Sequence, residues 1–223
     1  MYVTRNVPEP GLTMLKETGR FEVTQWASDA AVPQDELIKN VKGIDVLFCL
    51  LTDKINKDVL DSAGPSLKVI CTMSVGFEHI DTEECKKRNI AVANTPVVST
   101  ESIADFALTL MLSVSRRIPE ATRAVKNGEW GTWVPMWLCG PEVADSTVGI
   151  IGLGRIGFSV AKRVRGFGVK RLMYQDVVEL PHAKEVDAEF ADMDKLLKEA
   201  DFVIACCNLT DSTRHLFRAE TFQ

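Results

Sequence analysis

The stretch "TVGIIGLGRIGFSVAKRVRGFG", which runs from Thr147 to Gly168, joins an apolar run, three closely spaced glycines and a helical pattern. The run Val148 to Ile151 predicts a short buried strand. Apolar residues then recur every four positions, as they do on one face of a helix: Ile156, Val160 and Val164. The segment therefore predicts a strand, a tight turn and a helix in direct succession.

The turn carries the pattern G-x-G-x-x-G at Gly152, Gly154 and Gly157. The pattern alone is weak, but its place between a strand and a helix is typical of a dinucleotide-binding turn. Gly152 then permits the bend, Gly154 lets the backbone approach a pyrophosphate, and Gly157 allows close packing of helix on strand. Free amides and the positive end of the helix dipole face the phosphates. A glycine-rich turn without a ligand is the alternative interpretation.

An acidic residue follows the next predicted strand, "VKRLMY". This is Asp176, nineteen residues after Gly157. An acid at this place binds the ribose hydroxyls of the adenine half and repels the 2′-phosphate of NADP. The next basic residue along the chain is Lys184, so the local charge favours NAD. Two alternatives stay open: Asp176 is a solvated turn residue, or Gln175 occupies the key position.

Composition limits the class of protein. The 223 residues are 46% hydrophobic and carry a net charge of −5, which is typical of a soluble globular chain and argues against a nucleic-acid partner. The longest apolar run, "VLFCLL", falls far short of the roughly 18 to 20 residues of a membrane span. The N-terminus shows no signal peptide, and the six cysteines form no C-x-x-C pair. We therefore expect free thiols, a cytoplasmic location, no membrane contact and no metal site.

The first 96 residues alternate strand-like and helical runs, from "YVT" and "GLTMLKETG" to "LKVICTMSV" and "IAVANT". Such alternation predicts an α/β domain around a parallel sheet. Pro96 is a natural stop. We therefore place one domain at residues 1–96, and a linking helix, a loop and a nucleotide-binding unit at residues 97–223.

A long helical pattern spans residues 99–126, and Pro119 should kink or break it. Apolar residues recur along it at helical spacing: Ile103, Phe106, Ala107, Leu110, Met111 and Val114. The loop that follows holds Trp130, Trp133 and Trp137. So much aromatic surface on a loop requires a cover, either the body of this chain or a partner subunit.

Several blocks in order along the whole chain resemble the D-isomer-specific 2-hydroxyacid dehydrogenases: "MSVGFEHID", "NTPVVSTESIADFALTLML", "STVGIIGLGRIG" and "EADFVIACCNLTDSTRHLF". With "MWLCGPE" and "YVTRNVPEPG", the chain is similar to the glyoxylate/hydroxypyruvate reductase branch in particular. The resemblance implies a flavodoxin-like N-terminal substrate domain, a Rossmann domain with a doubly wound parallel sheet, and an active site between them. It also implies NAD(P)H as cofactor, a small 2-oxo or 2-hydroxy acid as substrate, and a homodimer.

The resemblance also implies site residues. Val75 and Gly76 would offer backbone amides to the substrate carboxylate, and oriented amides bind an anion without adding a titrating group. The cofactor would meet the three glycines, Asp176 and four further residues: Arg155, Ile156, Cys207 and Asn208. Asn208 replaces a proline that is common in the wider family. Trp137 lies in a segment that crosses to the partner subunit in this family.

Two departures from the family pattern matter. Val177 and Leu180 stand where the mammalian-type reductases hold the 2′-phosphate with arginines, so the sequence again favours NAD. The second departure concerns catalysis, which requires a proton donor and a cation to orient the substrate. The family supplies an Arg, a Glu and a His after the "LT..T" block, and we expect all three beyond Gln223. No catalytic residue is therefore assigned in these 223 residues.

The three histidines of the chain do not replace that machinery. His79, His182 and His215 have no motif around them, and a surface or helix-start role is expected for each. Only His79, three residues after Gly76, is close to the predicted substrate loop. We also expect the nucleotide-binding unit to be incomplete, with three strands that form only its first half.

Two hypotheses about function remain. The chain is either the N-terminal portion of a reductase that converts glyoxylate or hydroxypyruvate to glycolate or D-glycerate, or a non-catalytic dinucleotide-binding or interaction module. In both cases we expect the 223-residue chain to be inactive alone.

Overall fold

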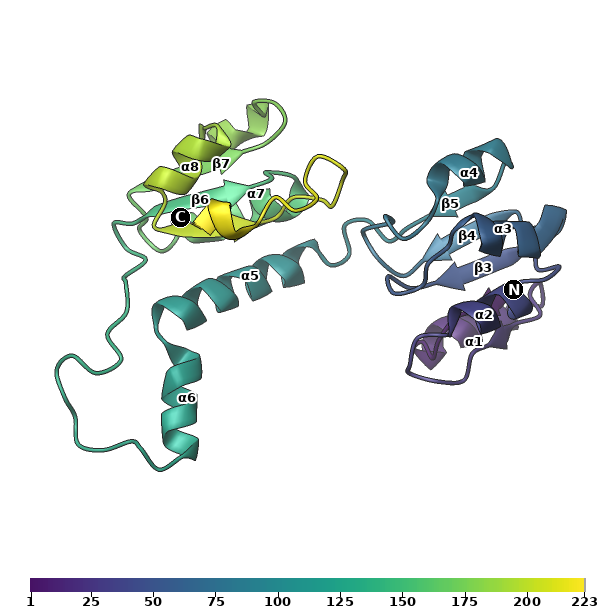
Figure 1. Cartoon of the computed structure of the whole chain (residues 1–223), viewed down its shortest axis with the longest axis horizontal. Coiled ribbons are helices and arrows are strands. Elements are labelled where there is room, and N and C mark those ends of the chain that lie inside the picture. The colour runs from purple at the N-terminus through teal and green to yellow at the C-terminus, as the bar shows by residue number, and fades with distance from the viewer. Residues whose placement is uncertain (223) are drawn as a thin grey trace. The chain divides into compact units, whose positions relative to one another are not determined.

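The computed structural model describes residues 1–222, which divide into two compact units, one that ends at Val97 and one that begins at Val98 (Figure 1). Each unit is an α/β structure with its own parallel sheet. The division falls directly after the predicted boundary at Pro96.

The first unit alternates strands and helices along the chain: β1 (Tyr2–Val3), α1 (Glu9–Glu17), β2 (Thr24–Gln25), α2 (Gln34–Asn40), β3 (Val46–Cys49), α3 (Lys57–Ala63), η1 (Gly64–Ser66), β4 (Val69–Thr72), α4 (Thr82–Lys87) and β5 (Ala91–Ala93). Its strands are all parallel and lie in the order β2-β1-β3-β4-β5. From β1 the chain first adds β2 on one side, and it then adds β3, β4 and β5 on the other side. This change of direction between β1 and β3 is the arrangement of a doubly wound sheet. The sequence pattern did not predict the short helix α4, because "TEECKK" carries one buried residue, Cys85.

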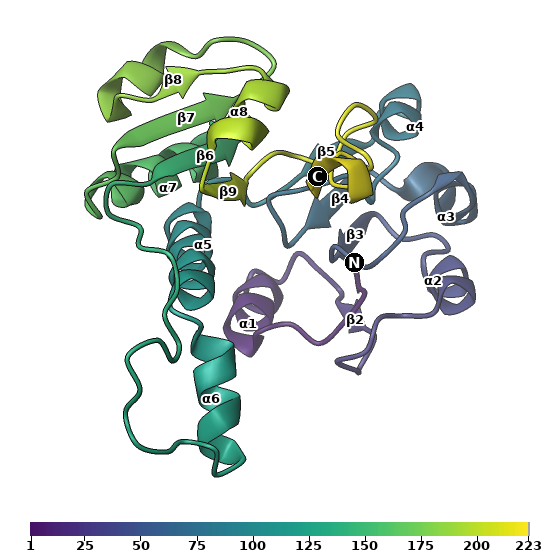
Figure 2. The same cartoon turned by 60° about the vertical axis from the view of Figure 1, so that its left-hand side comes forward.

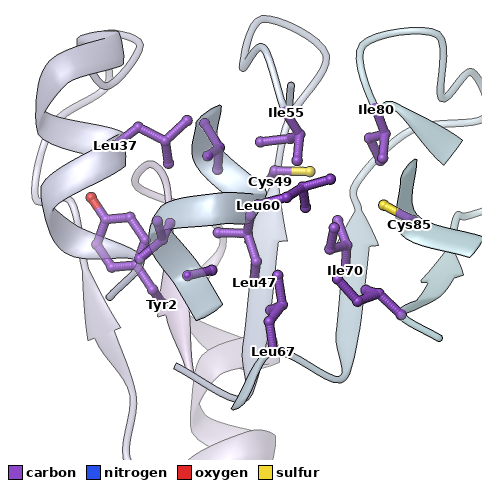
Figure 3. Close-up of a cluster of buried hydrophobic side chains, with 14 of the residues drawn as sticks. Tyr2, Leu37, Leu47, Cys49, Ile55, Leu60, Leu67, Ile70, Ile80 and Cys85 are labelled. Carbon is purple, nitrogen blue, oxygen red and sulfur yellow. The ribbon is translucent and has the colours of Figure 1, made fainter. Parts of the chain in front are cut away.

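The core of the first unit lies on one face of this sheet. Side chains alternate along β3, so Leu47 and Cys49 are buried while Val46 and Phe48 are half-buried. Figure 3 shows Leu47 and Ile70 from neighbouring strands packed with Leu37 of α2 and Leu60 of α3. Because parallel strands end at the same edge, the loops after β1, β3 and β4 meet there. The β3 and β4 loops pair through Ile55, whose amide donates to the carbonyl of His79 (2.9 Å).

The second unit contains α5 (Thr100–Ser115), α6 (Ile118–Lys126), β6 (Thr147–Ile151), α7 (Arg155–Arg165), β7 (Arg171–Gln175), η2 (Pro181–Val186), β8 (Glu189–Phe190), α8 (Met193–Glu199), β9 (Phe202–Ala205) and η3 (Ala219–Phe222). Its four parallel strands lie in the order β8-β7-β6-β9. Figure 2 shows α7 and α8 on either side of this sheet, and they pack on different sets of buried residues.

The expectation of three strands in the nucleotide-binding unit is wrong. The additional strand, β8, is only two residues long and both are exposed, so it has no apolar run that a sequence pattern would detect. The three strands β6, β7 and β8 form the first half of a dinucleotide-binding sheet. Strand β9 pairs with β6 on the side opposite to β7. The strand order therefore reverses between β6 and β9. The carboxyl ends of strands at such a reversal are where open α/β sheets bind ligands.

The predicted helix over residues 99–126 is two helices. The break lies at Arg117, which has a left-handed backbone (φ 53°), and Pro119 is in the first turn of α6. Proline has no amide hydrogen to donate, so it suits a helix start and ends the preceding helix, as expected.

Helix α5 buries only part of the apolar stripe that the spacing predicted, namely Met111 and, partly, Ala107. Its buried residues are Ala104, Leu108, Met111 and Ser115. The opposite face leaves large apolar side chains in solvent: Ile103, Phe106, Leu110 and Val114. Across residues 1–222, we find no helix with the length and apolar content needed to cross a membrane.

Candidate functional site

The glycine turn between β6 and α7 is tightly constrained at two of its glycines. Gly152 has φ +88° and lies against the backbone of Cys207, where a Cβ would come within 2.8 Å of the Cys207 amide nitrogen. A Cβ on Gly157 would lie 2.0 Å from the carbonyl oxygen of Gly152, so helix and turn meet here by backbone contact. Gly154 differs, because a Cβ there would meet nothing within 4 Å. The turn is therefore closed on its inner side and open at Gly154.

Helix α7 begins at this opening without a cap. No side chain accepts a hydrogen bond from the backbone amides of its first turn. The amides of Arg155, Ile156 and Gly157 find no acceptor among residues 1–222. Arg155 is exposed and has no ion pair within the same residues, whereas Ile156 packs into the core. Free amides at a helix N-terminus, beside a free guanidinium, form an anion-binding site.

Asp176 faces the glycine turn. Its Oδ2 accepts a hydrogen bond from the amide of Leu153 (2.8 Å), and its Oδ1 accepts one from the amide of Val177 (2.8 Å). Gln175 is the last residue of β7 and directs its side-chain amide to the Asp176 carbonyl (3.1 Å). Of the two residues that the sequence left as alternatives, Asp176 is thus the one whose side chain reaches the turn. The two hydrogen bonds orient the Asp176 carboxylate, and its remaining lone pairs can accept hydrogen bonds from hydroxyl groups.

His182 lies in the first turn of η2, where a helix-start role was expected, and its ring also binds the glycine turn. Its Nε2 lies 2.9 Å from the carbonyl oxygen of Leu153. Because that oxygen can only accept, Nε2 carries the hydrogen. The ring stands edge-on to Phe158 of α7, with centroids 5.0 Å apart. Leu153 is therefore held at its amide by Asp176 and at its carbonyl by His182. No sequence motif marks His182, because its partner lies 29 residues earlier in the chain.

Cys207 and Asn208 follow β9, on the far side of the strand reversal. The amide of Cys206 donates to the carbonyl of Ile151 (2.7 Å), which brings the backbone of Cys207 against Gly152. Burial raises the pKa of the Cys206 thiol to about 11, so this group is uncharged at neutral pH. Asn208 is exposed, and its carbonyl accepts a hydrogen bond from the Thr213 hydroxyl (2.6 Å).

These features fit a dinucleotide. The uncapped α7 and the open Gly154 would hold a pyrophosphate, and the carboxylate of Asp176 would accept ribose hydroxyls at the end of the neighbouring strand. Gly154 leaves the space that the phosphates need. Within residues 1–222, no group of three or more His, Cys, Asp or Glu side chains is placed to hold a metal ion.

The loop after β4 contains Val75 and Gly76, and its carbonyl groups are tied back into the first unit. The carbonyl of Val75 accepts from the Asn94 side-chain amide (2.8 Å), and that of Gly76 accepts from the Ser74 hydroxyl (2.7 Å). The carbonyl of Ser74 accepts from the amide of Thr95 (2.9 Å). These contacts hold the carbonyl oxygens of the loop toward residues of the first unit. The opposite side of the loop is therefore left without them.

The amides of the same loop are free. Val75, Gly76 and Phe77 donate to no acceptor among residues 1–222. Successive backbone N–H groups without acceptors form a concavity that binds anions, such as a carboxylate. One acidic side chain lies close by: a Cβ on Gly76 would be 2.5 Å from an Oε atom of the exposed Glu78. The three atoms nearest to that position all belong to the Glu78 carboxyl group, which is on a flexible side chain.

A buried polar chain lies beneath this loop. The hydroxyl oxygens of Thr72 and Ser74 are 2.7 Å apart, and His79 Nε2 is 3.0 Å from Thr72 Oγ1. His79 is half-buried, so its ring is not a fully exposed surface group. Burial lowers the pKa of the His79 imidazole, and the carboxylates of Asp53 and Glu78 oppose this shift.

The loop between α6 and β6 carries the three tryptophans. Trp130 and Trp137 contact each other edge to face, with ring centroids 4.6 Å apart. Trp133 is 79% exposed, so the body of this chain does not cover it.

The parallel sheet with its strand reversal, the glycine turn and the acid at the end of β7 define a nucleotide-binding α/β protein of the dinucleotide-binding class. The sequence profile of the D-isomer specific 2-hydroxyacid dehydrogenase NAD binding domain matches residues 108–223. The chain belongs to this family, whose members are NAD-dependent 2-hydroxyacid oxidoreductases.

Individual relatives agree with this assignment. The chain is 46% identical to the glyoxylate reductase/hydroxypyruvate reductase of Homo sapiens, over 100% of this chain and 68% of that protein. It is 41% identical to the glyoxylate reductase of Thermococcus kodakarensis, over 99% of this chain and 66% of that protein. The chain thus spans about two thirds of the length of these relatives.

Solved structures show the same fold. The TT0316 protein of Thermus thermophilus matches with a TM-score of 0.90 and 38% identity, over 99% of this chain and 68% of that one. The D-lactate dehydrogenase of Aquifex aeolicus, solved in complex with NAD and lactic acid, matches with a TM-score of 0.83 and 30% identity, over 99% of this chain and 65% of that one.

Proposed function

We propose that this chain supplies the substrate-carboxylate site and the dinucleotide site of a reductase that converts glyoxylate or hydroxypyruvate to glycolate or D-glycerate. The single observation that carries the proposal is the Ser74–Phe77 loop, whose carbonyls are tied back and whose amides are free. Such a loop suits the carboxylate of a small 2-oxo acid. The two reductases described above, 46% and 41% identical, support the choice of substrate.

We assign the two roles to the two units. The first unit has the strand order 2-1-3-4-5, which supports a flavodoxin-like substrate domain. The second unit holds the cofactor, and NADH supplies the hydride when bound. Gly152, Gly154 and Gly157 shape the turn, Arg155 and the free amides of α7 neutralise the pyrophosphate, and Cys207 and Asn208 line the opposite wall.

NAD is the proposed cofactor in preference to NADP. Asp176 is held in place by two backbone amides, so its negative charge cannot easily move aside for a 2′-phosphate. Val177 and Leu180 offer that phosphate no positive charge. We expect NADH to bind at least about tenfold more tightly than NADPH, which is the effect of about 1.4 kcal/mol. Fluorescence titration of the 223-residue chain with each cofactor tests this, and tighter binding of NADPH would refute it.

The absence of a free general acid is part of the proposal, and the state of two of the three histidines supports it. His79 Nε2 contacts Thr72, and His182 Nε2 donates to a carbonyl, so both rings are already engaged. We therefore propose that the 223-residue chain binds its ligands but does not turn them over. Substrate-dependent loss of NADH absorbance by the purified chain would show this part of the proposal to be wrong.

The second candidate is a non-catalytic module that binds a dinucleotide or a protein partner. The observation in its favour is that His79, three residues after Gly76, already has its Nε2 engaged by Thr72. The two candidates differ in the predicted ligand of the Ser74–Phe77 loop. An NMR titration with glyoxylate distinguishes them. Shifts of the amide resonances of this loop would support the reductase, whereas binding of NADH without any such shift on addition of glyoxylate would support the module.

A homodimer and a cytoplasmic location belong to the same proposal. The exposed apolar face of α5, together with Trp133 and Trp137 of the loop after α6, supports contact with a second copy. The six free thiols support a reducing compartment.

A further inference from the structure

The carboxylate-binding loop sits on a hydrogen-bond chain that runs from His79 through Thr72 and Ser74 to the carbonyl of Gly76. Its three links measure 3.0, 2.7 and 2.7 Å. Thr72 and Ser74 are buried, and His79 is half-buried. Water therefore competes poorly for these bonds, and each lies within the normal range for a hydrogen bond.

The chemistry of the last link fixes the direction of every proton in the chain. The carbonyl oxygen of Gly76 can only accept, so the Ser74 hydroxyl donates to it. Ser74 has then used its single hydrogen, and the 2.7 Å contact requires that the Thr72 hydroxyl donates to Ser74. Thr72 has in turn used its hydrogen, so it must accept from His79. His79 therefore carries a hydrogen on Nε2, and in the neutral imidazole its Nδ1 is then bare.

The surroundings of His79 are consistent with this tautomer. Its Nδ1 is buried and has no hydrogen-bond partner in the described part of the chain. A hydrogen on Nδ1 would be a buried donor without an acceptor, which costs free energy. The groups that face the ring are Asp53 of the loop after β3, the neighbouring Glu78, and Cys49 of β3. Burial raises the pKa of the Cys49 thiol to about 12, so it stays uncharged.

We propose that His79, acting through Thr72 and Ser74, is a positioning residue for the substrate carboxylate. Its Nε2 bonds to Thr72 and not to the free amides themselves. It holds the Gly76 carbonyl turned inward, and because each peptide group is planar, this fixes the direction of the next amide, that of Phe77. The inference rests on the proposed function, since it assumes that the loop binds a carboxylate.

Affinity for glyoxylate, measured by NMR titration of the 15N-labelled 223-residue chain, tests the inference. Ser74→Ala removes the donor to Gly76 and should weaken binding about tenfold, the effect of one net hydrogen bond. His79→Phe keeps a ring but loses the donor, and should weaken binding about three- to tenfold. His79→Gln can still donate from its Nε2 and should restore affinity to within about twofold. The control is Thr82→Val, because the Thr82 hydroxyl makes no hydrogen bond in the described residues.

The double variant Ser74→Ala/His79→Phe separates positioning from a general structural effect. If His79 acts through Ser74, its loss should change nothing further once Ser74 is gone, so the double variant should match Ser74→Ala alone. Independent structural damage would instead add, giving about thirty- to a hundredfold weaker binding. Additive losses would overturn the inference.

The proton position gives a readout that needs no ligand. A long-range 1H–15N correlation spectrum of the free chain should show His79 with hydrogen on Nε2 and a bare Nδ1. Hydrogen on Nδ1 alone would overturn the inference even if glyoxylate binds. If glyoxylate does not bind the wild-type chain, the proposed function fails, whereas the tautomer still decides whether the hydrogen-bond chain is correct.

Discussion

Gly154 and Gly157 belong to one motif but have opposite surroundings. A Cβ would enter open space at Gly154 and would meet a carbonyl oxygen at 2.0 Å at Gly157. Gly154 also has an ordinary extended backbone (φ −67°), so alanine fits it without strain. The first glycine therefore leaves room for a ligand, and the second allows α7 to pack against the turn.

We expect Gly154→Ala to preserve the fold and to weaken NADH binding at least about tenfold, because the methyl group takes the space of the pyrophosphate. Gly157→Ala should instead lower the free energy of unfolding by about 3 kcal/mol, because backbone cannot move aside as a side chain can. Thermal unfolding and fluorescence titration of both variants distinguish the two effects. Equal losses of stability in the two variants would contradict this interpretation.

His79 should make stability depend on pH. Its pKa in the folded chain is below the ordinary value of 6.5, chiefly through burial. The unfolded chain thus binds a proton first as the pH falls, so stability is full above about pH 7.5 and declines below 6.5 towards the lowered pKa. Thermal unfolding at pH 8.0 and 5.5 should show a smaller loss for His79→Gln than for the wild type. An identical loss in both proteins would contradict the prediction.

The sequence identified the residues that belong to a local motif. The glycines follow β6 and Asp176 follows the next strand, β7, so both could be proposed as cofactor contacts from their spacing in the chain, with Gln175 left as an alternative to Asp176. His79 and His182 could not be placed in this way. The ring of His182 reaches a carbonyl 29 residues away, and His79 acts through two hydroxyl groups whose direction depends on a folded loop.

At the scale of the elements, β6 and α8 pack unusually closely at Gly149. A Cβ at this position would lie 2.6 Å from Cδ2 of Leu196, a fully buried side chain. The sequence pattern predicted both elements but gave no sign of this contact, because the two residues are 47 positions apart. The absence of a side chain at Gly149 sets the distance between the helix and the sheet.

Gly149→Ala should therefore lower the free energy of unfolding by about 1–3 kcal/mol through overpacking. Leu196→Ala alone should cost about 2–5 kcal/mol because it leaves a cavity. The double variant should lose less than the sum of the two, since the new methyl group fills part of that cavity. Urea unfolding of the three variants measures this coupling, and simple additivity would show that the two side chains do not meet.

At the scale of the molecule, the solvent-exposed face of α5 carries more large apolar side chains than the exposed face of an ordinary surface helix. Phe106 is 61% exposed and Val114 69% exposed. Patches of this kind mark interaction surfaces. The proposed occupant is a second copy of the chain.

Phe106→Asp/Val114→Asp should convert a dimer to a monomer, because charges in an apolar interface lose their hydration. Analytical ultracentrifugation should show twice the chain mass for the wild type and the chain mass for the variant. Met14→Asp, at an exposed apolar residue of the first unit, is the control and should stay dimeric. A monomeric wild type at micromolar concentration would refute the proposed homodimer.

The sequence by itself determined two α/β units, the glycine turn, the acid after β7 and the family, because these depend on short-range patterns and on blocks in a fixed order. The tertiary structure decided the rest. It showed the fourth strand, the reversal between β6 and β9, the packing face of α5 and the hydrogen-bond chain under Gly76. Each of these depends on which groups meet across the fold, where burial and the geometry of hydrogen bonds, rather than local preference, select the arrangement.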